Sequence, residues 1–377
     1  MENKTQPDST YSTRQSRLLE ELQKAGLDTL ALNPGPSLTY LTGLHFHLME
    51  RPVVALFFPG REPYIVLPEL ETAKVRELPF TVQAFTYGDN PQTWSQAFRQ
   101  AAQSANLNGK KVGVEPTRLR FLELKFLEQA APQAQFLDAE KALASLRLCK
   151  DKNEVDAMRK AVDIAQKAFL ATLPSIKIGV TERDIASELT LQLLRAGSQP
   201  EMPFSPIVST GPDSANPHAS PSGRVLAEGD LLVVDWGAIY NGYVSDLTRT
   251  IALGKIEPEF ERIGEIVLEA NAAGRAAARP GIRAGEVDRA ARQVIEKAGY
   301  GQYFFHRVGH GIGMEGHEAP YMYAENDLIL EPGMAFTVEP GIYLPERGGV
   351  RIEDNVIITA NGAETLSDLP RELFHVV

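Results

Sequence analysis

The feature that most constrains the fold of this chain is a pair of apolar strands that carry acidic side chains in their interior. Residues 230–253, DLLVVDWGAIYNGYVSDLTRTIAL, contain Asn241-Gly242, the strongest two-residue signal for a β-hairpin with a type I′ turn. With these two residues as the loop, position 248 faces Asp235, and Asp246 lies on the same face of the ribbon as a diagonal neighbour of Asp235. The sequence therefore predicts a sheet in which two carboxylates are aimed at one point.

A second pair of apolar strands repeats this arrangement further along the chain. The segment MAFTVEPGIYL places Glu339 inside an apolar strand, and GGVRIEDNVIIT places Arg351 and Glu353 two positions apart, hence on one face. Asp354 points to the opposite face and is expected to be structural. Inward carboxylates in apolar strands are very costly unless something positive lies between them, so we expect bound cations at the place where the two strand pairs meet.

Three of the seven histidines lie in residues 305–318, FHRVGHGIGMEGHE. Their spacing differs from the His-Glu-x-x-His of a helical zinc site, so at most one of them need be a ligand. His310, between two glycines, has room for close backbone approach. Several carboxylates with one imidazole and no thiolate suit two divalent ions of the manganese, cobalt, iron or zinc kind, with a bridging water activated as hydroxide. The simpler alternative is that one aspartate of the first strand pair caps a turn or pairs with Arg249.

The chain divides into two regions of different texture. Residues from about 15 to 148 alternate helical and strand patterns, which predicts a compact α/β domain, and residues 1–14 are expected to be a flexible tail. From 149 to 377 one unit is used twice, with two helices, an irregular loop and a pair of strands in each copy. We therefore predict an N-terminal α/β domain over 1–148 and a pseudo-twofold catalytic domain over 149–377.

Charge and composition restrict the partners. A formal net charge of −11 argues against nucleic acid, because phosphate neutralisation needs a surplus of Lys and Arg. The apolar runs are far shorter than the about 20 residues that span a bilayer, and the polar N-terminus does not resemble a signal peptide. The single cysteine, Cys149, excludes an internal disulfide. A soluble, cytoplasmic protein is expected.

The strand and histidine motifs together resemble a known family. VVDWG with SDLTRT, GHGIGMEGHE, FTVEPGIY and GGVRIEDNV are similar to the pita-bread metallopeptidases, in their Xaa-Pro branch of aminopeptidase P and Xaa-Pro dipeptidase, or prolidase. The resemblance covers about residues 150–370, and SLTYLTGL in the N-terminal part is similar to the smaller, creatinase-like domain of that branch. It implies that two divalent metal ions, manganese first among them, are held by Asp235, Asp246, His310, Glu339 and Glu353.

The resemblance also implies roles for residues around the ions. Glu339 would accept the proton of the bridging water, His218 and His317 would contact the substrate or its developing oxyanion, and Arg351 would support the metal carboxylates. His306 would line the proline pocket. The plain alternatives are a solvated surface histidine at 218 and a packed core histidine at 306.

The implied activity is hydrolysis of the peptide bond before proline, with an Xaa-Pro dipeptidase favoured over an Xaa-Pro aminopeptidase that acts on longer peptides. A homodimer is implied by resemblance alone. A methionine aminopeptidase is disfavoured because Glu353 is followed by Asp-Asn rather than His-Thr, and a creatinase-like enzyme or a non-catalytic scaffold because no metal carboxylate is lost. A dipeptidase also needs a group for the free carboxylate of its substrate, for which the candidates are Arg51, Arg61, His45 and His47.

Overall fold

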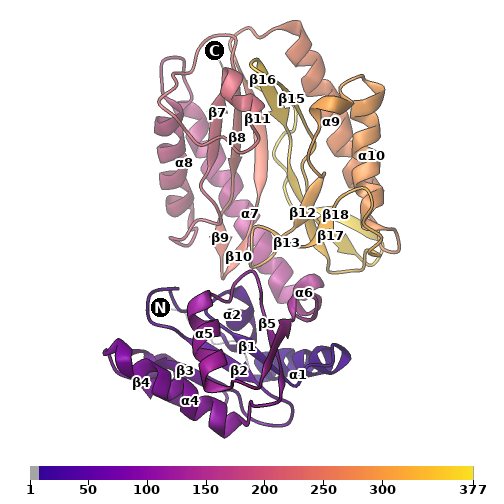
Figure 1. Cartoon of the computed structure of the whole chain (residues 1–377). Helices are drawn as coiled ribbons and strands as arrows, with labels where there is room; N and C mark the ends of the chain where they lie inside the picture. Colours follow the sequence, from indigo (N-terminus) through magenta and orange to yellow (C-terminus); the bar gives the residue numbers. More distant parts are fainter. Residues whose placement is uncertain (1–7, 377) are drawn as a thin grey trace. The chain divides into compact units, whose positions relative to one another are not determined.

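The computed structural model describes residues 8–376 and divides between Arg147 and Leu148 into two compact units, here called the N-terminal and the C-terminal unit. The N-terminal unit is built on a six-stranded sheet of order β4-β3-β2-β1-β5-β6 (Figure 1). Its strands are β1 Thr29–Leu32, β2 Val54–Phe57, β3 Tyr64–Pro68, β4 Gln83–Tyr87, β5 Lys111–Val114 and β6 Gln135–Asp138. Its helices are α1 Asp8–Lys24, α2 Pro36–Thr42, α3 Thr72–Arg76, α4 Trp94–Ala105, α5 Phe121–Ala130 and α6 Glu140–Leu148.

The flexible tail expected over residues 1–14 is wrong for residues 8–14, which form the first turns of α1. Arg14 is buried, its guanidinium lies 3.9 Å from the centre of the Tyr40 ring, and its Nη1 donates to the Tyr40 carbonyl oxygen at 3.0 Å. An arginine can cover apolar surface with its stem and an aromatic face with its head, so a polar segment is fixed here without an apolar stripe. Residues 1–7 lie outside the described residues.

The C-terminal unit shows the predicted repeat. Each half contains two helices and a set of three neighbouring antiparallel strands. Further strands flank each set of three in its sheet. The first half contains α7 Lys152–Thr172, α8 Glu182–Ala196, β7 Ile207–Thr210, β8 Leu231–Trp236 and β11 Leu247–Leu253. The second half contains α9 Pro258–Ala277, α10 Ala284–Lys297, β12 Gly309–Gly311, β14 Ala335–Val338 and β17 Asp354–Thr359.

Shorter elements complete this unit. The strand β19 Phe374–Val376 runs parallel to β11, while β13 Glu318–Met322 and β18 Gly362–Thr365 flank the second sheet. In each half a two-stranded ribbon extends the hairpin, namely β9 Ile239–Tyr240 with β10 Tyr243–Val244, and β15 Gly341–Leu344 with β16 Gly348–Arg351. The 3₁₀ helices of the two units are Glu69–Glu71, Pro91–Thr93, Leu173–Ser175, Gly211–Ala215 and Gly301–Tyr303.

Local sequence explains where the helices of the repeat begin. The side chain of Thr181 accepts from the backbone N–H of Asp184, whose carboxylate accepts in return from the N–H of Thr181, so α8 begins with a capping box. Asp151 and Glu154 form the same reciprocal cap at the start of α7, directly after the division between the units. Both caps satisfy backbone N–H groups that a helix start otherwise leaves without a partner.

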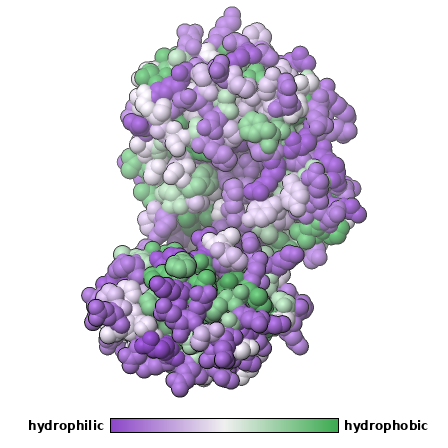
Figure 2. Space-filling model, in the orientation of Figure 1, coloured by the Kyte–Doolittle hydropathy of each residue, from purple (hydrophilic) through white to green (hydrophobic). Residues whose placement is uncertain are grey.

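Two large apolar cores lie in the C-terminal unit, and a smaller cluster joins α7 to strands of both halves. In Figure 1, α8 lies outside β7 and β8, and α9 and α10 lie outside the strands of the second half. Buried side chains from each helix pair meet the adjacent sheet, and Phe169 of α7 stacks on Trp236 of β8 with 4.4 Å between the ring centroids. Hydrophilic residues cover most of the visible face of this unit in Figure 2, so its apolar side chains are concentrated in these cores.

The two sheets meet at the centre of the unit through one isolated backbone bridge and through side-chain contacts, and not through a continuous ladder. Thr248 and Glu353 form an isolated antiparallel bridge, in which the Glu353 N–H donates to the Thr248 carbonyl oxygen at 3.1 Å. The Asn355 side chain holds the backbone of Asp246 from both sides, since its Nδ2 donates to the Asp246 carbonyl oxygen at 2.7 Å and its Oδ1 accepts from the N–H at 3.1 Å. The inward carboxylates of the two strand pairs are thereby brought to one junction.

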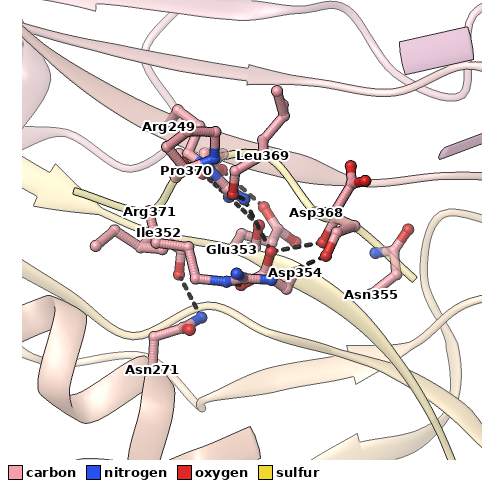
Figure 3. A network of polar contacts seen from close by, with 12 residues as sticks. Arg249, Asn271, Ile352, Glu353, Asp354, Asn355, Asp368, Leu369, Pro370 and Arg371 are labelled. Carbon is pink, nitrogen blue, oxygen red and sulfur yellow. Dashed lines mark hydrogen bonds and ion pairs between the residues drawn. The ribbon is translucent and has the colours of Figure 1, made fainter. Parts of the chain in front are cut away.

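Behind this junction lies a buried ion network around Asp354 (Figure 3). The Asp354 carboxylate accepts from Arg249 Nη2 at 2.9 Å and from Arg371 Nε at 2.7 Å. Burial by itself would raise the pKa of Asp354, but Arg249 and Arg371 hold it below its ordinary value. Asp354 lies on the face opposite Glu353, as expected. The alternative pairing of Arg249 with Asp235 or Asp246 is wrong, because strand alternation turns Arg249 to the opposite side of the sheet, where it pairs with Asp354.

Replacing Asp354 with alanine is expected to lower the free energy of unfolding by about 3–5 kcal/mol, because it leaves the fully buried Arg249 guanidinium without its counter-charge. Urea unfolding at neutral pH measures this change. Asp368→Ala is the matched control, since this aspartate is exposed in the same region, and it should change the free energy by less than about 0.5 kcal/mol. Equal effects of the two substitutions would contradict the structural role of Asp354.

Candidate metal centre

The first hairpin has the register that Asn241-Gly242 predicts. Both turn residues have positive φ, 50° for Asn241 and 78° for Gly242, as a type I′ turn requires. Tyr240 faces Tyr243, and Asp235 faces Thr248, so the register runs unchanged through the interruption between the ribbon β9–β10 and the strands β8 and β11. The predicted hairpin is confirmed, and Asp235 and Asp246 lie on one face.

Three of the acidic side chains lie where the strand ladder is interrupted. Asp246 falls between β10 and β11, Glu339 between β14 and β15, and Glu353 between β16 and β17. The Glu339 N–H donates to the Val308 carbonyl oxygen at 2.7 Å, so the backbone is fixed although the strand has ended. Interrupted ladders let a strand change direction, and here each interruption places a carboxylate at the junction of the two sheets.

His310 lies in β12, and its flanking glycines are required by close packing. A Cβ atom on Gly309 would lie 1.9 Å from the Thr337 carbonyl oxygen, and one on Gly311 would lie 2.2 Å from the Ala319 carbonyl oxygen. Both distances are far too short for a side chain, so the expectation of close backbone approach at His310 is confirmed. The packed backbones on either side hold the imidazole inside the sheet junction.

The His310 imidazole is neutral and presents a lone pair to the acidic group. Its Nδ1 donates to the Gly311 carbonyl oxygen at 3.1 Å, which leaves Nε2 without a proton. Burial lowers the pKa of His310 to about 3, and the neighbouring His317 adds to that shift. Nε2 lies 3.3 Å from Glu339 Oε1 and 3.7 Å from Asp246 Oδ2. A lone pair facing carboxylate oxygens is repulsive unless a cation lies between them.

The acidic group has the unsatisfied atoms expected of a metal site. Asp246, His310 and Glu353 each offer a ligand atom, and these atoms lie within 4.8 Å of one another. Three buried carboxylate oxygens have no hydrogen-bond partner among the described residues, and they are Asp235 Oδ1, Asp246 Oδ1 and Glu353 Oε1. Buried acceptors of this kind are rare unless an ion satisfies them. The residues present therefore fit the divalent cations that the sequence led us to expect.

The pKa values of the same carboxyl groups reflect their crowding. Burial raises the pKa of Asp246 well above its ordinary value, and the charge of Glu353 adds to it. Burial likewise raises the pKa of Glu353, with Glu339 adding, and it raises the pKa of Glu339 to about 7 against the opposing charge of Arg351. Divalent cations would reverse these shifts, because they favour the charged carboxylates.

Arg351 is a buried cation that reaches this group. Its Nη2 donates to Asp235 Oδ2 at 2.6 Å, its Nε donates to Thr248 Oγ1 at 3.1 Å, and its Nη1 donates to Tyr343 OH at 3.1 Å. Thr248 in turn donates to Glu353 Oε2 at 2.7 Å. The buried guanidinium therefore orients two of the carboxylates, one directly and one through a threonine hydroxyl.

Tyr343 links Arg351 to His306, and sequence reasoning did not identify it. Because Tyr343 OH accepts from Arg351, its own proton is free to be donated to His306 Nε2, 3.0 Å away. His306 Nδ1 then donates to the Arg307 carbonyl oxygen at 2.7 Å. Burial lowers the pKa of His306 to about 4, so the ring is neutral with both nitrogens engaged, and it can offer a substrate only its carbon face. A tyrosine in an apolar strand gives no sequence signal beyond core packing.

Replacing Tyr343 with phenylalanine tests this link. The change leaves His306 Nε2 and Arg351 Nη1 without one partner each, so we expect a loss of about 1–3 kcal/mol in the free energy of unfolding. We also expect a fall in kcat of about tenfold or more, because Asp235 loses part of its support. Thermal unfolding and steady-state kinetics measure the two effects. Tyr323→Phe, on an exposed tyrosine of the same unit, should leave both unchanged.

The remaining predicted histidines lie at the edge of the group. The exposed His317 ring stacks on His310 with 3.7 Å between centroids, and its Nδ1 lies 3.4 Å from Arg307 Nη2. His218 is exposed in its loop, which Arg351 holds by donating to the Pro217 carbonyl oxygen at 3.3 Å. Burial lowers the pKa of His317, and His218 is close enough to contribute to that shift.

The four residues considered for a substrate carboxylate belong to the N-terminal unit and have contacts there. Arg51 pairs with Asp89 at 2.6 Å, and Arg61 donates to the Ala105 carbonyl oxygen at 3.1 Å. The exposed rings of His45 and His47 lie edge to face, 5.8 Å apart. None of the four gains a role in the metal centre from these contacts.

Four carboxylates and one neutral imidazole, gathered where two repeated half-sheets meet, define a metal-dependent hydrolase of the pita-bread fold. Residues 156–360 match the metallopeptidase family M24, and residues 14–149 match the creatinase/prolidase N-terminal domain. The chain belongs to metallopeptidase family M24. Across residues 8–376, no helix combines the length and the apolar character needed to span a membrane.

Relatives and solved structures agree with this assignment. The chain is 37% identical over 330 residues to the Xaa-Pro dipeptidase of Pyrococcus furiosus, covering 86% of this chain and 94% of that protein. It is similar to the crystal structure of a dipeptidase from Pyrococcus horikoshii OT3, with a TM-score of 0.90, 36% identity and coverage of 96% and 100%. The X-Pro aminopeptidase of Thermotoga maritima MSB8 gives a TM-score of 0.83 with 29% identity and coverage of 96% and 99%.

Proposed function

We propose that this metallopeptidase is an Xaa-Pro dipeptidase, which hydrolyses the peptide bond before proline in dipeptides. The observation that carries the proposal is the buried group of Asp246, His310 and Glu353, whose ligand atoms lie within 4.8 Å of one another, with unpaired carboxylate oxygens turned into it. A relative named Xaa-Pro dipeptidase and a solved dipeptidase support the substrate class.

Two divalent ions would be held by Asp235, Asp246, His310, Glu339 and Glu353. When bound, the ions lower the pKa of a water molecule and polarise the scissile carbonyl as Lewis acids. The carboxylate-rich donor set favours manganese, while cobalt, iron and zinc are compatible with it.

Glu339 is placed to receive the proton of the attacking water. Thr337 Oγ1 orients Glu339 Oε1 from 3.1 Å, and the charge of Arg351 favours the ionised carboxylate, which is the form that accepts a proton. The leaving prolyl nitrogen needs a proton when the bond breaks, and Glu339 supplies it. Arg351 keeps Asp235 in place during both transfers.

Neutral histidines at the edge of the group can stabilise the developing oxyanion. His317 Nδ1 faces the donor Arg307 Nη2, so its proton resides on Nε2 and can be donated to the substrate. His218 lies across the same edge as a second donor. A proline ring has no N–H to recognise, so its pocket requires apolar walls, which Phe305 and the buried Tyr343, 5.4 Å apart between centroids, can provide together with the carbon face of His306.

The second candidate is an Xaa-Pro aminopeptidase. The Thermotoga maritima X-Pro aminopeptidase has the same fold, but its 29% identity is lower than that of the dipeptidases. The group of proposed metal residues is complete, which disfavours a creatinase-like enzyme and a non-catalytic scaffold. The Asp-Asn that follows Glu353 disfavours a methionine aminopeptidase. Manganese as the native ion, a homodimer and a cytoplasmic location stay predictions.

Hydrolysis of Ala-Pro and Ala-Pro-Ala by chelator-treated protein, alone and with manganese, cobalt or zinc restored, tests the function. We expect no activity without metal, and with metal a preference for the dipeptide. Preference for the tripeptide would favour the aminopeptidase. Inactivity on both peptides, with metal bound to the protein, would favour a scaffold.

A further inference from the structure

Arg307 is a cation beside the metal centre that forms no ion pair with a carboxylate of residues 8–376, although its charge helps to lower the pKa of Glu339. It precedes β12, its side chain is half-buried, and no acidic side chain in residues 8–376 lies within ion-pair distance of its guanidinium. A guanidinium always carries its charge and has five N–H donors, most of which are uncommitted here. Such a group next to a catalytic site is suited to a negatively charged part of the substrate.

Two aromatic contacts fix the guanidinium at the edge of the site. Its Cζ lies 4.5 Å from the centre of the Tyr321 ring, and Tyr321 faces His310 across the β12–β13 pair. Its Nη2 lies 3.4 Å from Nδ1 of His317, whose ring stacks on His310. Stacking on one aromatic face orients the planar fork while its outer N–H groups stay available. The Arg307 guanidinium therefore lies beside His317, whose ring stacks on the proposed metal ligand His310.

The other positive group of the centre is already committed. Arg351 donates to Asp235, Thr248, Pro217 and Tyr343 and is 2% exposed. His306 has both ring nitrogens engaged, with the Arg307 carbonyl oxygen at 2.7 Å and with Tyr343 OH at 3.0 Å, and His310 Nδ1 donates to the Gly311 carbonyl oxygen at 3.1 Å. Within the described C-terminal unit, Arg307 is therefore the uncommitted cation that contacts this group.

An Xaa-Pro dipeptide carries a negative charge close to its scissile bond. Its free carboxylate is attached to the ring carbon that directly follows the scissile prolyl nitrogen, so it must lie at the edge of the centre when the bond is attacked. An amide or a longer peptide has a neutral carbonyl at the same place. A cation there would favour dipeptides and would add little for a longer substrate.

We propose that Arg307 binds the free carboxylate of the dipeptide substrate and is therefore a specificity-determining residue of this enzyme. The inference rests on the proposed Xaa-Pro dipeptidase function and places the carboxylate-binding group in the C-terminal unit, in addition to the four candidates of the N-terminal unit. The planar fork can hold both carboxylate oxygens at once, which a lysine ammonium does less well.

Kinetics of Arg307→Ala and Arg307→Lys on Ala-Pro and on Ala-Pro amide test the proposal. For Arg307→Ala we expect kcat/KM on Ala-Pro to fall by about 30- to 100-fold, mostly through KM, and to fall about tenfold less on the amide, which loses only the contact of Arg307 with His317. Arg307→Lys should recover part of the loss. Arg347→Ala is the matched control, because Arg347 also lies over an aromatic ring, 5.3 Å from the centre of Phe260, and it should leave both substrates unchanged.

Binding of the product provides a second readout, measured by calorimetry with proline and with prolinamide on the metal-loaded protein. We expect the wild-type protein to bind proline more tightly and Arg307→Ala to lose that preference. Equal losses on acid and amide would overturn the proposal and assign Arg307 to the orientation of His317 alone. Equal cleavage of acid and amide by the wild type would also overturn it, whereas cleavage of neither with metal bound would refute the proposed function itself.

Discussion

Glu339→Gln is expected to lower kcat for Xaa-Pro hydrolysis by about three orders of magnitude, because glutamine cannot take the proton of the attacking water. The substitution is nearly isosteric, so Thr337 can still donate to the side-chain oxygen, and Glu339 N–H keeps its bond to Val308. The folded structure should therefore survive. Steady-state kinetics with manganese in excess measure the loss, and circular dichroism checks the fold.

Loss of activity by itself does not separate a missing base from a missing ligand. Metal content per chain, measured by atomic emission after desalting, distinguishes them, and we expect the Glu339 variant to retain metal at saturating concentration. Glu331→Gln is the matched control, because this glutamate is exposed on the same unit and should behave as the wild type. Full activity of a metal-replete Glu339 variant would remove Glu339 from the mechanism.

Glu353→Gln is expected to have opposite effects on activity and on the stability of the metal-free protein. Activity should be lost almost completely, because Glu353 is one of the proposed metal ligands. Wild-type protein should gain about 2.7 kcal/mol of stability at a metal concentration one hundred times the dissociation constant, and the variant should gain far less. Thermal unfolding with and without manganese measures both.

Without metal the variant should be more stable than the wild type, and the difference should grow with pH. Burial and Glu339 raise the pKa of Glu353 above its ordinary value in the folded protein. Below the ordinary pKa, folded and unfolded chains are both protonated, so the favourable contribution of the group is complete. As pH rises toward the folded pKa the unfolded chain releases the proton first, and stability falls by about 1.4 kcal/mol per pH unit.

Glutamine does not titrate, so the difference between the two metal-free proteins reports the titration of Glu353 together with the effect of its charge on Asp246. Urea unfolding in chelator at several pH values from 4.5 upward measures it. The exposed Glu331→Gln should show no such difference at any pH. A difference that stays constant with pH would mean that Glu353 is not protonated in the folded metal-free protein.

Much of the fold follows from local sequence signals. Asn241-Gly242 determined the register that places Asp235 opposite Thr248, since a type I′ turn allows one pairing. Thr181 and Asp184 marked the start of α8, because an unpaired helix start requires a cap. By contrast, the start of α1 was missed. The buried position four residues before Leu18 is occupied by Arg14, a polar residue that packs on Tyr40 and so does not extend the apolar pattern.

Sequence by itself determined which side chains point inward, because strand alternation depends only on neighbouring residues. It could place Asp354 and Glu353 on opposite faces, but it could not say that Arg249 pairs with Asp354. Partners more than a hundred residues apart are chosen by the packing of the two half-sheets. The chain of Arg351, Tyr343 and His306, and the uncommitted charge of Arg307, arise from that packing. Local pattern specifies a direction for each group, whereas only the tertiary structure decides what each group meets.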